Sequence, residues 1–146
     1  MIEQKTHLGI YGVIQSDNNI LLIKKSRGPY KGKFDLPGGK LEHGEGLCDG
    51  LAREINEETG LTAKDFKLYD NYSVTVDFND GKKEISMYHV GLIYLVIVAS
   101  IDDIKETTDE EDSLGSFWHT IANLDVEQLS PFAKMAVKTI RNEPQK

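Results

Sequence analysis

The strongest turn signal of the chain, Asn79-Asp80-Gly81, separates two long segments that are rich in aromatic and β-branched residues. Asparagine, aspartate and glycine tolerate the backbone angles of a tight hairpin turn, so the two segments are predicted to form paired strands. The second segment contains the most apolar run, Val90 to Ala99, which has about half the length of a membrane-spanning helix. We therefore predict a buried strand at this run.

The remaining periodic segments predict further strands and two helices. Short β-branched runs at Leu8 to Ile14 and Asn19 to Lys25 flank the turn-forming sequence QSDNN, which indicates a second hairpin, and residues 115–121 resemble a late strand. Apolar residues at spacings of three and four predict a helix over Leu47 to Thr59. A terminal helix is predicted after Ser130, a capping residue that is followed by proline. Together these elements predict the α/β (α+β) class, an α/β/α sandwich with a mixed β-sheet.

Composition narrows the setting of the protein. A length of 146 residues is typical of one domain, expected over residues 1–146. The net charge of −7 opposes a broad grip on long nucleic acid or on anionic lipid. The single cysteine, Cys48, excludes an internal disulfide and indicates a reducing, cytoplasmic location. The N-terminal segment has no basic region followed by an apolar run, so we expect no signal peptide and no membrane partner.

Three glutamates of the first helix stand out because like charges repel. Glu54, Glu57 and Glu58 would project from one stripe at the edge of the apolar face. No lysine or arginine follows Glu54 or Glu57 four positions later, so the helix is expected to leave these charges unrelieved. Such a cluster is either a solvated acidic surface or a set of hard oxygen ligands for a divalent cation. The helix alone leaves both interpretations open.

The segment before the helix adds the residues that carry a family resemblance. Gly39 is followed after five residues by Glu45, and after seven more by Arg53-Glu54-Ile55, one residue, Glu57-Glu58, one residue and Gly60-Leu61. This pattern resembles the signature of the Nudix hydrolases, and every fixed position matches. The segment FDLPGG before the pattern, and a late tryptophan followed by a terminal helix, extend the likeness to about Leu8 to Arg141.

The resemblance implies a hydrolase that depends on Mg²⁺ or Mn²⁺ and cleaves a phosphoanhydride bond in a nucleoside diphosphate linked to another group, by attack of metal-bound water. Glu54 and Glu58 would be the principal metal ligands together with the Gly39 carbonyl, as the match implies. Glu57 would hold a metal directly or through water. Arg53 would pair with Glu45 and orient the helix carboxylates.

Two further roles are open at the level of the sequence. The general base differs among Nudix members, and we weigh Glu54 against the late acidic loop, where Glu111 is favoured as base and as metal ligand. Lys25 and Arg27 border the loop before the signature and are candidates for binding substrate phosphates, with exposed cations at a strand end as the alternative. The candidates for stacking on a base are Tyr11, Tyr72, Phe78 and Tyr88.

The only sequence feature that bears on the choice of substrate is the lack of a proline after the signature. The stretch from Thr62 to Asp80 contains no proline of the kind associated with ADP-ribose hydrolysis in this family, which favours a nucleoside triphosphate, oxidised ones included, or a small nucleotide-linked metabolite. A non-hydrolysing, nucleotide-sensing Nudix module is one alternative, and a dinucleoside polyphosphate or mRNA-cap hydrolase is another. The intact signature counts against the first, and the lack of a basic patch counts against long RNA. The expected partner is a small nucleotide, and a homodimer is left open.

Overall fold

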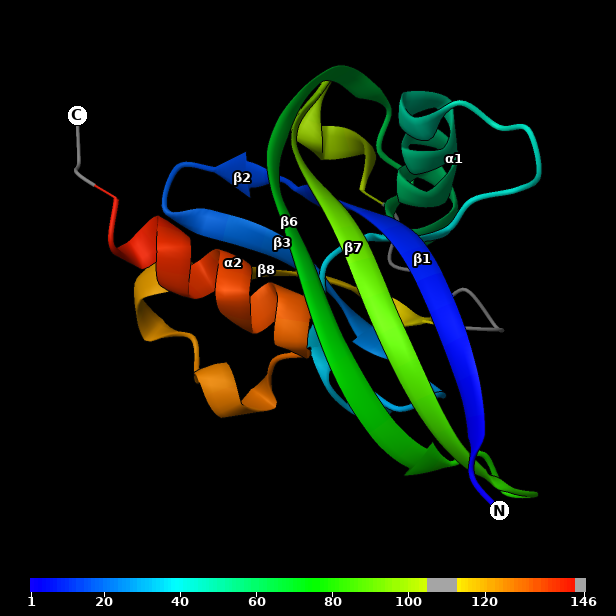
Figure 1. Ribbon diagram of the computed structural model, residues 1–146. Helices are drawn as coiled ribbons and strands as arrows, with labels where there is room; N and C mark the ends of the chain where they lie inside the picture. The colour runs from blue at the N-terminus through cyan, green and yellow to red at the C-terminus, as the bar shows by residue number, and fades with distance from the viewer. Residues whose placement is uncertain (105–112, 144–146) are drawn as a thin grey trace.

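The computed structural model describes residues 1–104 and 113–143, which form two β-sheets and two α-helices (Figure 1). The first sheet has the strand order β5-β1-β7-β6, and in the second β3 pairs with β2, β4 and β8. The strands are β1 (Glu3–Val13), β2 (Gln15–Ser16), β3 (Asn19–Lys25), β4 (Phe34–Asp35), β5 (Gly38–Lys40), β6 (Ala63–Asn79), β7 (Glu84–Val98) and β8 (Ser113–Thr120). The helices are α1 (Leu47–Thr59) and α2 (Pro131–Arg141), and short 3₁₀ helices span Ile101–Asp103, Ile121–Asn123 and Val126–Gln128.

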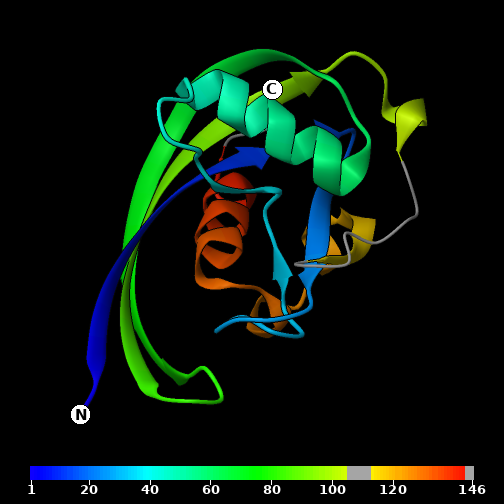
Figure 2. The ribbon, with the colours of Figure 1, turned by 90° about the vertical axis from the view of Figure 1, so that its right-hand side faces the viewer.

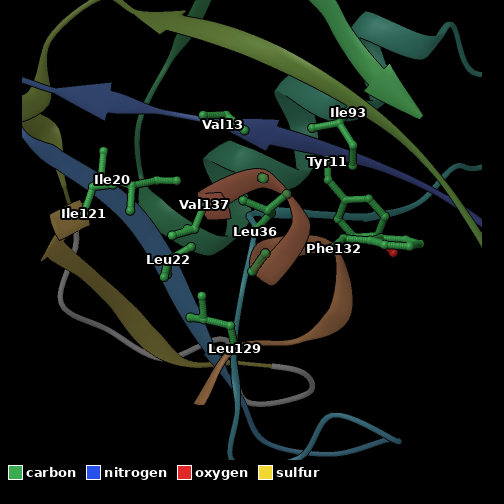
Figure 3. Packing of buried hydrophobic residues seen from close by; sticks show 12 residues of the cluster. Tyr11, Val13, Ile20, Leu22, Leu36, Ile93, Ile121, Leu129, Phe132 and Val137 are labelled. Atoms are coloured by element: carbon green, nitrogen blue, oxygen red, sulfur yellow. The ribbon is translucent and has the colours of Figure 1, made fainter. Parts of the chain in front are cut away.

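Both faces of the central strands are covered, one by each helix. In β1, Ile10 packs in one core with Leu51 and Ile55 of α1. The next residue, Tyr11, points to the opposite face and packs in a second core with Phe132 of α2. Figure 2 shows α2 within the curve of the long strands and α1 across their end, and Figure 3 shows the second core between β1, β3 and α2. This arrangement confirms the predicted α+β class and the mixed sheet, with the strands divided over two sheets.

The hairpin predicted at Asn79-Asp80-Gly81 is confirmed, since β6 and β7 pair in antiparallel fashion across this turn. The hairpin predicted between Leu8 to Ile14 and Asn19 to Lys25 is wrong. β1 instead runs parallel to β7. Antiparallel pairing across the QSDNN turn is limited to the two residues of β2 and a hydrogen bond of 3.0 Å from the backbone N–H of Leu21 to Ile14 O. The physical reason is burial: Ile10 and Tyr11 are buried on opposite faces, which requires a strand inside a sheet that is covered on both sides.

The start of α2 also differs in detail from the prediction. Ser130 is the N-cap residue, but its side chain makes no capping hydrogen bond. Its hydroxyl donates instead to Oδ1 of the buried Asp35, at 2.5 Å, and the same oxygen accepts from the Leu36 backbone at 2.8 Å. Burial raises the pKa of Asp35 above its usual value, against the effect of these hydrogen bonds. Ser130 therefore ties α2 to β4.

Gly38 determines how closely β5 approaches β1. Its φ is +141°, and a Cβ at this position would lie 2.1 Å from the backbone oxygen of Ile10. Only glycine fits such a contact, so the pairing of β5 with β1 depends on it. This pairing places Gly39 opposite Ile10 and beside α1.

Among residues 1–104 and 113–143, neither helix has the length and apolar character that a membrane-spanning helix needs.

Candidate active site

Helix α1 has the bounds that its spacing predicted, Leu47–Thr59, and it carries the signature glutamates. Leu51 and Ile55 are fully buried and hold the helix on the core. Gly60 ends the helix with a φ of +80°, and its backbone N–H donates to Asn56 O at 2.9 Å. This left-handed ending is favourable for glycine and fixes the direction in which the last turn presents its side chains.

Glu58 is the most deeply placed of the three glutamates, with an exposed fraction of only 2%. Its Oε1 accepts a hydrogen bond of 2.7 Å from the backbone N–H of Gly38. The pKa of Glu58 is raised well above its usual value, chiefly by burial, and the nearby Glu54 carboxylate adds to the rise. A carboxylate that is desolvated and has another carboxylate as neighbour is stabilised in its charged form by a cation.

Glu54 lies at the mouth of the same site, where its side chain is 18% exposed. A Cβ added to Gly39 would lie 3.2 Å from the Glu54 carboxyl group. Glycine thus lets the backbone of β5 come close to this carboxylate. Glu57 is different, because its side chain is 52% exposed. The expectation that the three glutamates lie at the edge of the core is therefore wrong for Glu58, which is buried and bound to the Gly38 backbone.

Arg53 connects several carboxylates around the helix. Its guanidinium donates to both oxygens of Glu45, from Nε at 2.8 Å and from Nη2 at 2.9 Å. Its Nη1 also contacts Glu54 at 3.1 Å and Glu57 at 3.4 Å. The expected contact between Arg53 and Glu45 is present. The expectation that the helix leaves its carboxylates unrelieved is wrong, because Arg53 precedes Glu57 by four positions and relieves it from the N-terminal side.

The bidentate contact has a clear electrostatic effect. The hydrogen bond from Arg53 is the largest cause of a fall in the pKa of Glu45 to about 2. Gly50 makes room for this contact, because a Cβ there would lie 2.8 Å from Oε1 of Glu45. Glu45 is therefore charged at neutral pH and holds the guanidinium between the loop and the helix.

The residues around Glu58 fit a divalent cation by the chemistry of their atoms. In residues 1–104 and 113–143, no three His, Cys, Asp or Glu side chains gather closely enough to form a metal site by themselves. Glu54 and Glu58 line one cavity with Gly39, so two carboxylates and a backbone carbonyl are available. Magnesium prefers such hard oxygen donors and keeps several water or phosphate ligands, so a set of this size suits it. Glu111, the other predicted ligand and base, lies outside the described residues.

The cavity beside these carboxylates has a volume of about 410 Å³. Lys25 and Arg27, the predicted phosphate ligands, line it together with Glu54 and Glu58. The remaining lining residues include His7, Tyr11, Tyr30, Met87 and His89. Of the four predicted stacking residues, only Tyr11 lines this cavity. Carboxylates, cations and aromatic side chains are thus combined in one hollow, as binding of a nucleotide and a cation would require.

Apart from Tyr11, the residues that bring aromatic character to this cavity were not predicted from the sequence. His7 and His89 lie opposite each other in the parallel pairing of β1 with β7, and their ring centroids are 4.9 Å apart. Tyr30 comes from the loop between β3 and β4. Three distant segments meet here, so no local spacing signals the cluster. Tyr72, a predicted stacking residue, packs instead on Phe132 in the core.

Comparison with known proteins agrees with the fold and the signature. The family model described as the NUDIX domain matches residues 5–141, and the chain belongs to this family of hydrolases. It is 48% identical over 66 residues to an ADP-ribose pyrophosphatase of Methanocaldococcus jannaschii, a match that covers 45% of this chain and 39% of that protein. It is 33% identical over 108 residues to the nucleoside triphosphatase NudI of Escherichia coli, covering 68% of this chain and 74% of that one.

A similar solved structure is the MutT Nudix hydrolase of Burkholderia pseudomallei. It superposes with a TM-score of 0.71 at 25% identity, over 92% of this chain and 98% of that chain. The likeness therefore extends over both sheets and both helices, beyond the signature itself.

Replacement of Arg53 by alanine is expected to lower turnover by about 10- to 100-fold, because the residue positions carboxylates without contacting the reacting atoms. The measurement is turnover and cation affinity of the variant, with Arg53→Lys as the matched control. Lysine keeps the charge but cannot make the two parallel bonds to Glu45, so an intermediate rate is expected. Cation affinity should fall less than in Glu58→Gln. Unchanged turnover in Arg53→Ala would show that the pairing has no supporting role.

Proposed function

We propose that this protein is a divalent-metal-dependent hydrolase of small nucleotides, which cleaves a phosphoanhydride bond in a nucleoside diphosphate linked to another group. The observation that carries the proposal is the buried carboxylate of Glu58, which lies with Glu54 on the wall of a cavity that Lys25 and Arg27 also line. A polyanionic substrate could not approach two carboxylates unless cations offset their charge. The family membership supports the same chemistry.

The residues divide into three roles. Glu54, Glu58 and the Gly39 carbonyl would hold Mg²⁺ or Mn²⁺, with Glu57 assisting directly or through water, and the ion would supply charge neutralisation and a more acidic water. Lys25 and Arg27 would bind phosphate oxygens. Arg53 and Glu45 would keep the helix carboxylates oriented.

In the reaction, a water oxygen would bond to one phosphorus atom while the bridging oxygen leaves with the neighbouring phosphate group. A carboxylate takes up the proton of the attacking water. Glu54 and Glu111 are the candidates for this base, and Glu111 remains a prediction from the sequence.

The substrate class that we favour is a nucleoside triphosphate, oxidised ones included, or a small nucleotide-linked metabolite. The relatives named above act on ADP-ribose and on nucleoside triphosphates, so both belong in the test. The proposal also takes residues 1–146 as one domain, and a cytoplasmic location follows only from the single cysteine. A nucleotide-sensing module and a dinucleoside polyphosphate or cap hydrolase are the alternatives.

The test is a panel of nucleoside triphosphates, ADP-ribose, sugar nucleotides and dinucleoside polyphosphates, each incubated with magnesium. Released phosphate, pyrophosphate or nucleoside monophosphate is measured, and Glu58→Gln serves as the control for a contaminating activity. We expect the wild-type protein, but not Glu58→Gln, to turn over at least one nucleotide of the panel. Tight binding of a nucleotide without any turnover across the panel would favour the sensing module instead.

A further inference from the structure

Three buried side chains form a continuous hydrogen-bonded chain along the wall of the cavity. The Tyr11 hydroxyl lies 2.7 Å from Nε2 of His89, and the Tyr30 hydroxyl lies 2.8 Å from Nδ1 of the same ring. The exposed fractions are 4% for Tyr11, 3% for His89 and 7% for Tyr30. All three residues line the cavity that Glu54 and Glu58 also line. The chain therefore joins β1, β7 and the β3–β4 loop at the site.

The imidazole of His89 is neutral in this environment. Its pKa is lowered to about 3, first by burial and then by electrostatic repulsion between protonated His89 and its neighbours His7 and Lys25. Each ring nitrogen contacts a hydroxyl group, and the faces and edges of the ring pack on His7, Tyr30 and Phe132. A neutral imidazole carries one N–H donor and one lone pair. One tyrosine must therefore donate to the ring and the other must accept from it.

Counting hydrogens shows that one donor is left over. Two hydroxyl groups and one neutral imidazole carry three polar hydrogens, and the two hydrogen bonds within the chain use two of them. The third hydrogen belongs to the hydroxyl that accepts from His89. Among residues 1–104 and 113–143, neither Tyr11 nor Tyr30 makes a second hydrogen bond. Since a buried hydroxyl without an acceptor is costly and both tyrosines line the cavity, an occupant of the cavity is the partner left for this hydrogen.

We propose that the Tyr11–His89–Tyr30 chain is a specificity determinant, which presents one uncharged hydrogen-bond donor to an acceptor atom of the substrate's nucleobase. The acceptor would be a carbonyl oxygen or an unprotonated ring nitrogen. This inference rests on the proposed function, since it assumes that the cavity takes a nucleotide.

The surroundings favour a base over a phosphate group as the occupant of this position. His7 and Met87 lie beside the chain and line the same cavity, and an imidazole and a thioether are suited to contact a flat aromatic ring. The charged phosphates have Lys25, Arg27 and Lys40 available on the cavity wall. An uncharged donor adds little to the binding free energy of a phosphate group. It does discriminate between bases, because a base that has no acceptor atom facing the tyrosine leaves the hydroxyl without a hydrogen bond.

The test measures binding without turnover, so that it stands apart from catalysis. AMP, GMP, UMP and CMP are titrated into wild-type protein, Tyr11→Phe, Tyr30→Phe and the double variant, with inorganic tripolyphosphate as the ligand that lacks a base. One single variant should weaken the preferred nucleotide about three- to tenfold, the loss of one uncharged hydrogen bond. The other should bind it within about twofold of wild type, because the remaining hydroxyl still donates. Tripolyphosphate affinity should be the same in all four proteins.

Other outcomes overturn the inference in distinguishable ways. Equal weakening of nucleotides and tripolyphosphate would indicate that the chain only supports the fold, and unchanged nucleotide affinity in the double variant would remove the contact altogether. A ¹⁵N spectrum of His89 that shows two protonated nitrogens at pH 7 would refute the hydrogen count. A wild-type protein that binds tripolyphosphate but none of the four nucleotides would refute this inference, whereas the proposed function is refuted separately, by the absence of turnover across the substrate panel.

Discussion

Glu58→Gln is expected to lower turnover about a thousandfold, roughly 4 kcal/mol of barrier, while it makes the metal-free protein more stable. The loss of turnover and the gain in stability have the same cause. The Glu58 carboxylate is 2% exposed and, among the described residues, accepts a hydrogen bond only from the Gly38 N–H. Glutamine keeps that hydrogen bond through its amide oxygen but removes the charge, so it is a poor ligand for a hard cation. Removing a buried charge should raise the free energy of unfolding by about 1–3 kcal/mol.

The gain in stability should depend on pH in a defined direction. The folded-state pKa of Glu58 is raised above the value near 4.5 of the unfolded chain. The cost of the charged carboxylate is therefore fully present above its folded pKa, shrinks as the pH falls below that pKa, and disappears near the unfolded-state value. The difference in stability between Glu58→Gln and wild type is thus largest at neutral pH and above, and it should close on acidification. Thermal or denaturant unfolding at several pH values measures it.

Glu57→Gln is the matched control, because the same substitution is made on an exposed side chain of the same helix. Its turnover loss should be smaller and its thermal midpoint should change little. Glu54→Gln should lose turnover as severely as Glu58→Gln but gain no stability, since its carboxylate already pairs with Arg53 at 3.1 Å. Near-normal turnover in both Glu54→Gln and Glu58→Gln would return these residues to the interpretation of an acidic surface.

Withdrawal of divalent cations is expected to abolish turnover completely, and magnesium or manganese should restore it. The ion should also stabilise the fold, because it binds the folded state alone and offsets the charge of Glu58. At 100 times the dissociation constant the gain is about 2.7 kcal/mol, visible as a higher thermal midpoint. Glu58→Gln should lose most of this gain. Full turnover in excess chelator would refute the metal-dependent mechanism.

The parts of the site that could be predicted are those encoded over short distances. The bounds of α1 follow from apolar spacing, and the contact between Arg53 and Glu45 from the signature. The depth of Glu58 could not be predicted, because a helical projection gives the direction of a side chain but not what covers it. Here the cover is the Gly38 backbone, which only glycine allows so close to β1.

The features that escaped prediction depend on contacts between distant segments. Tyr11 and His89 are 78 positions apart, and Tyr30 and His89 are 59 apart. They meet because β1 lies parallel to β7, whereas the local signal favoured a hairpin with β3. The hydrogen-bond partner of Ser130 could not be predicted for the same reason. Its place at the helix start was predictable, but the buried Asp35 takes its hydroxyl, and 95 positions separate the two residues.

The binding of Mn²⁺ in the absence of any substrate, followed by electron paramagnetic resonance, tests the central claim most directly. It does not depend on which nucleotide is hydrolysed. The account predicts a bound ion in the wild-type protein, an affinity about 100-fold or more weaker in Glu58→Gln, and a smaller loss in Arg53→Ala, which removes only a supporting partner. Equal Mn²⁺ affinity in wild type and Glu58→Gln would contradict the assignment of the buried carboxylate as a metal ligand.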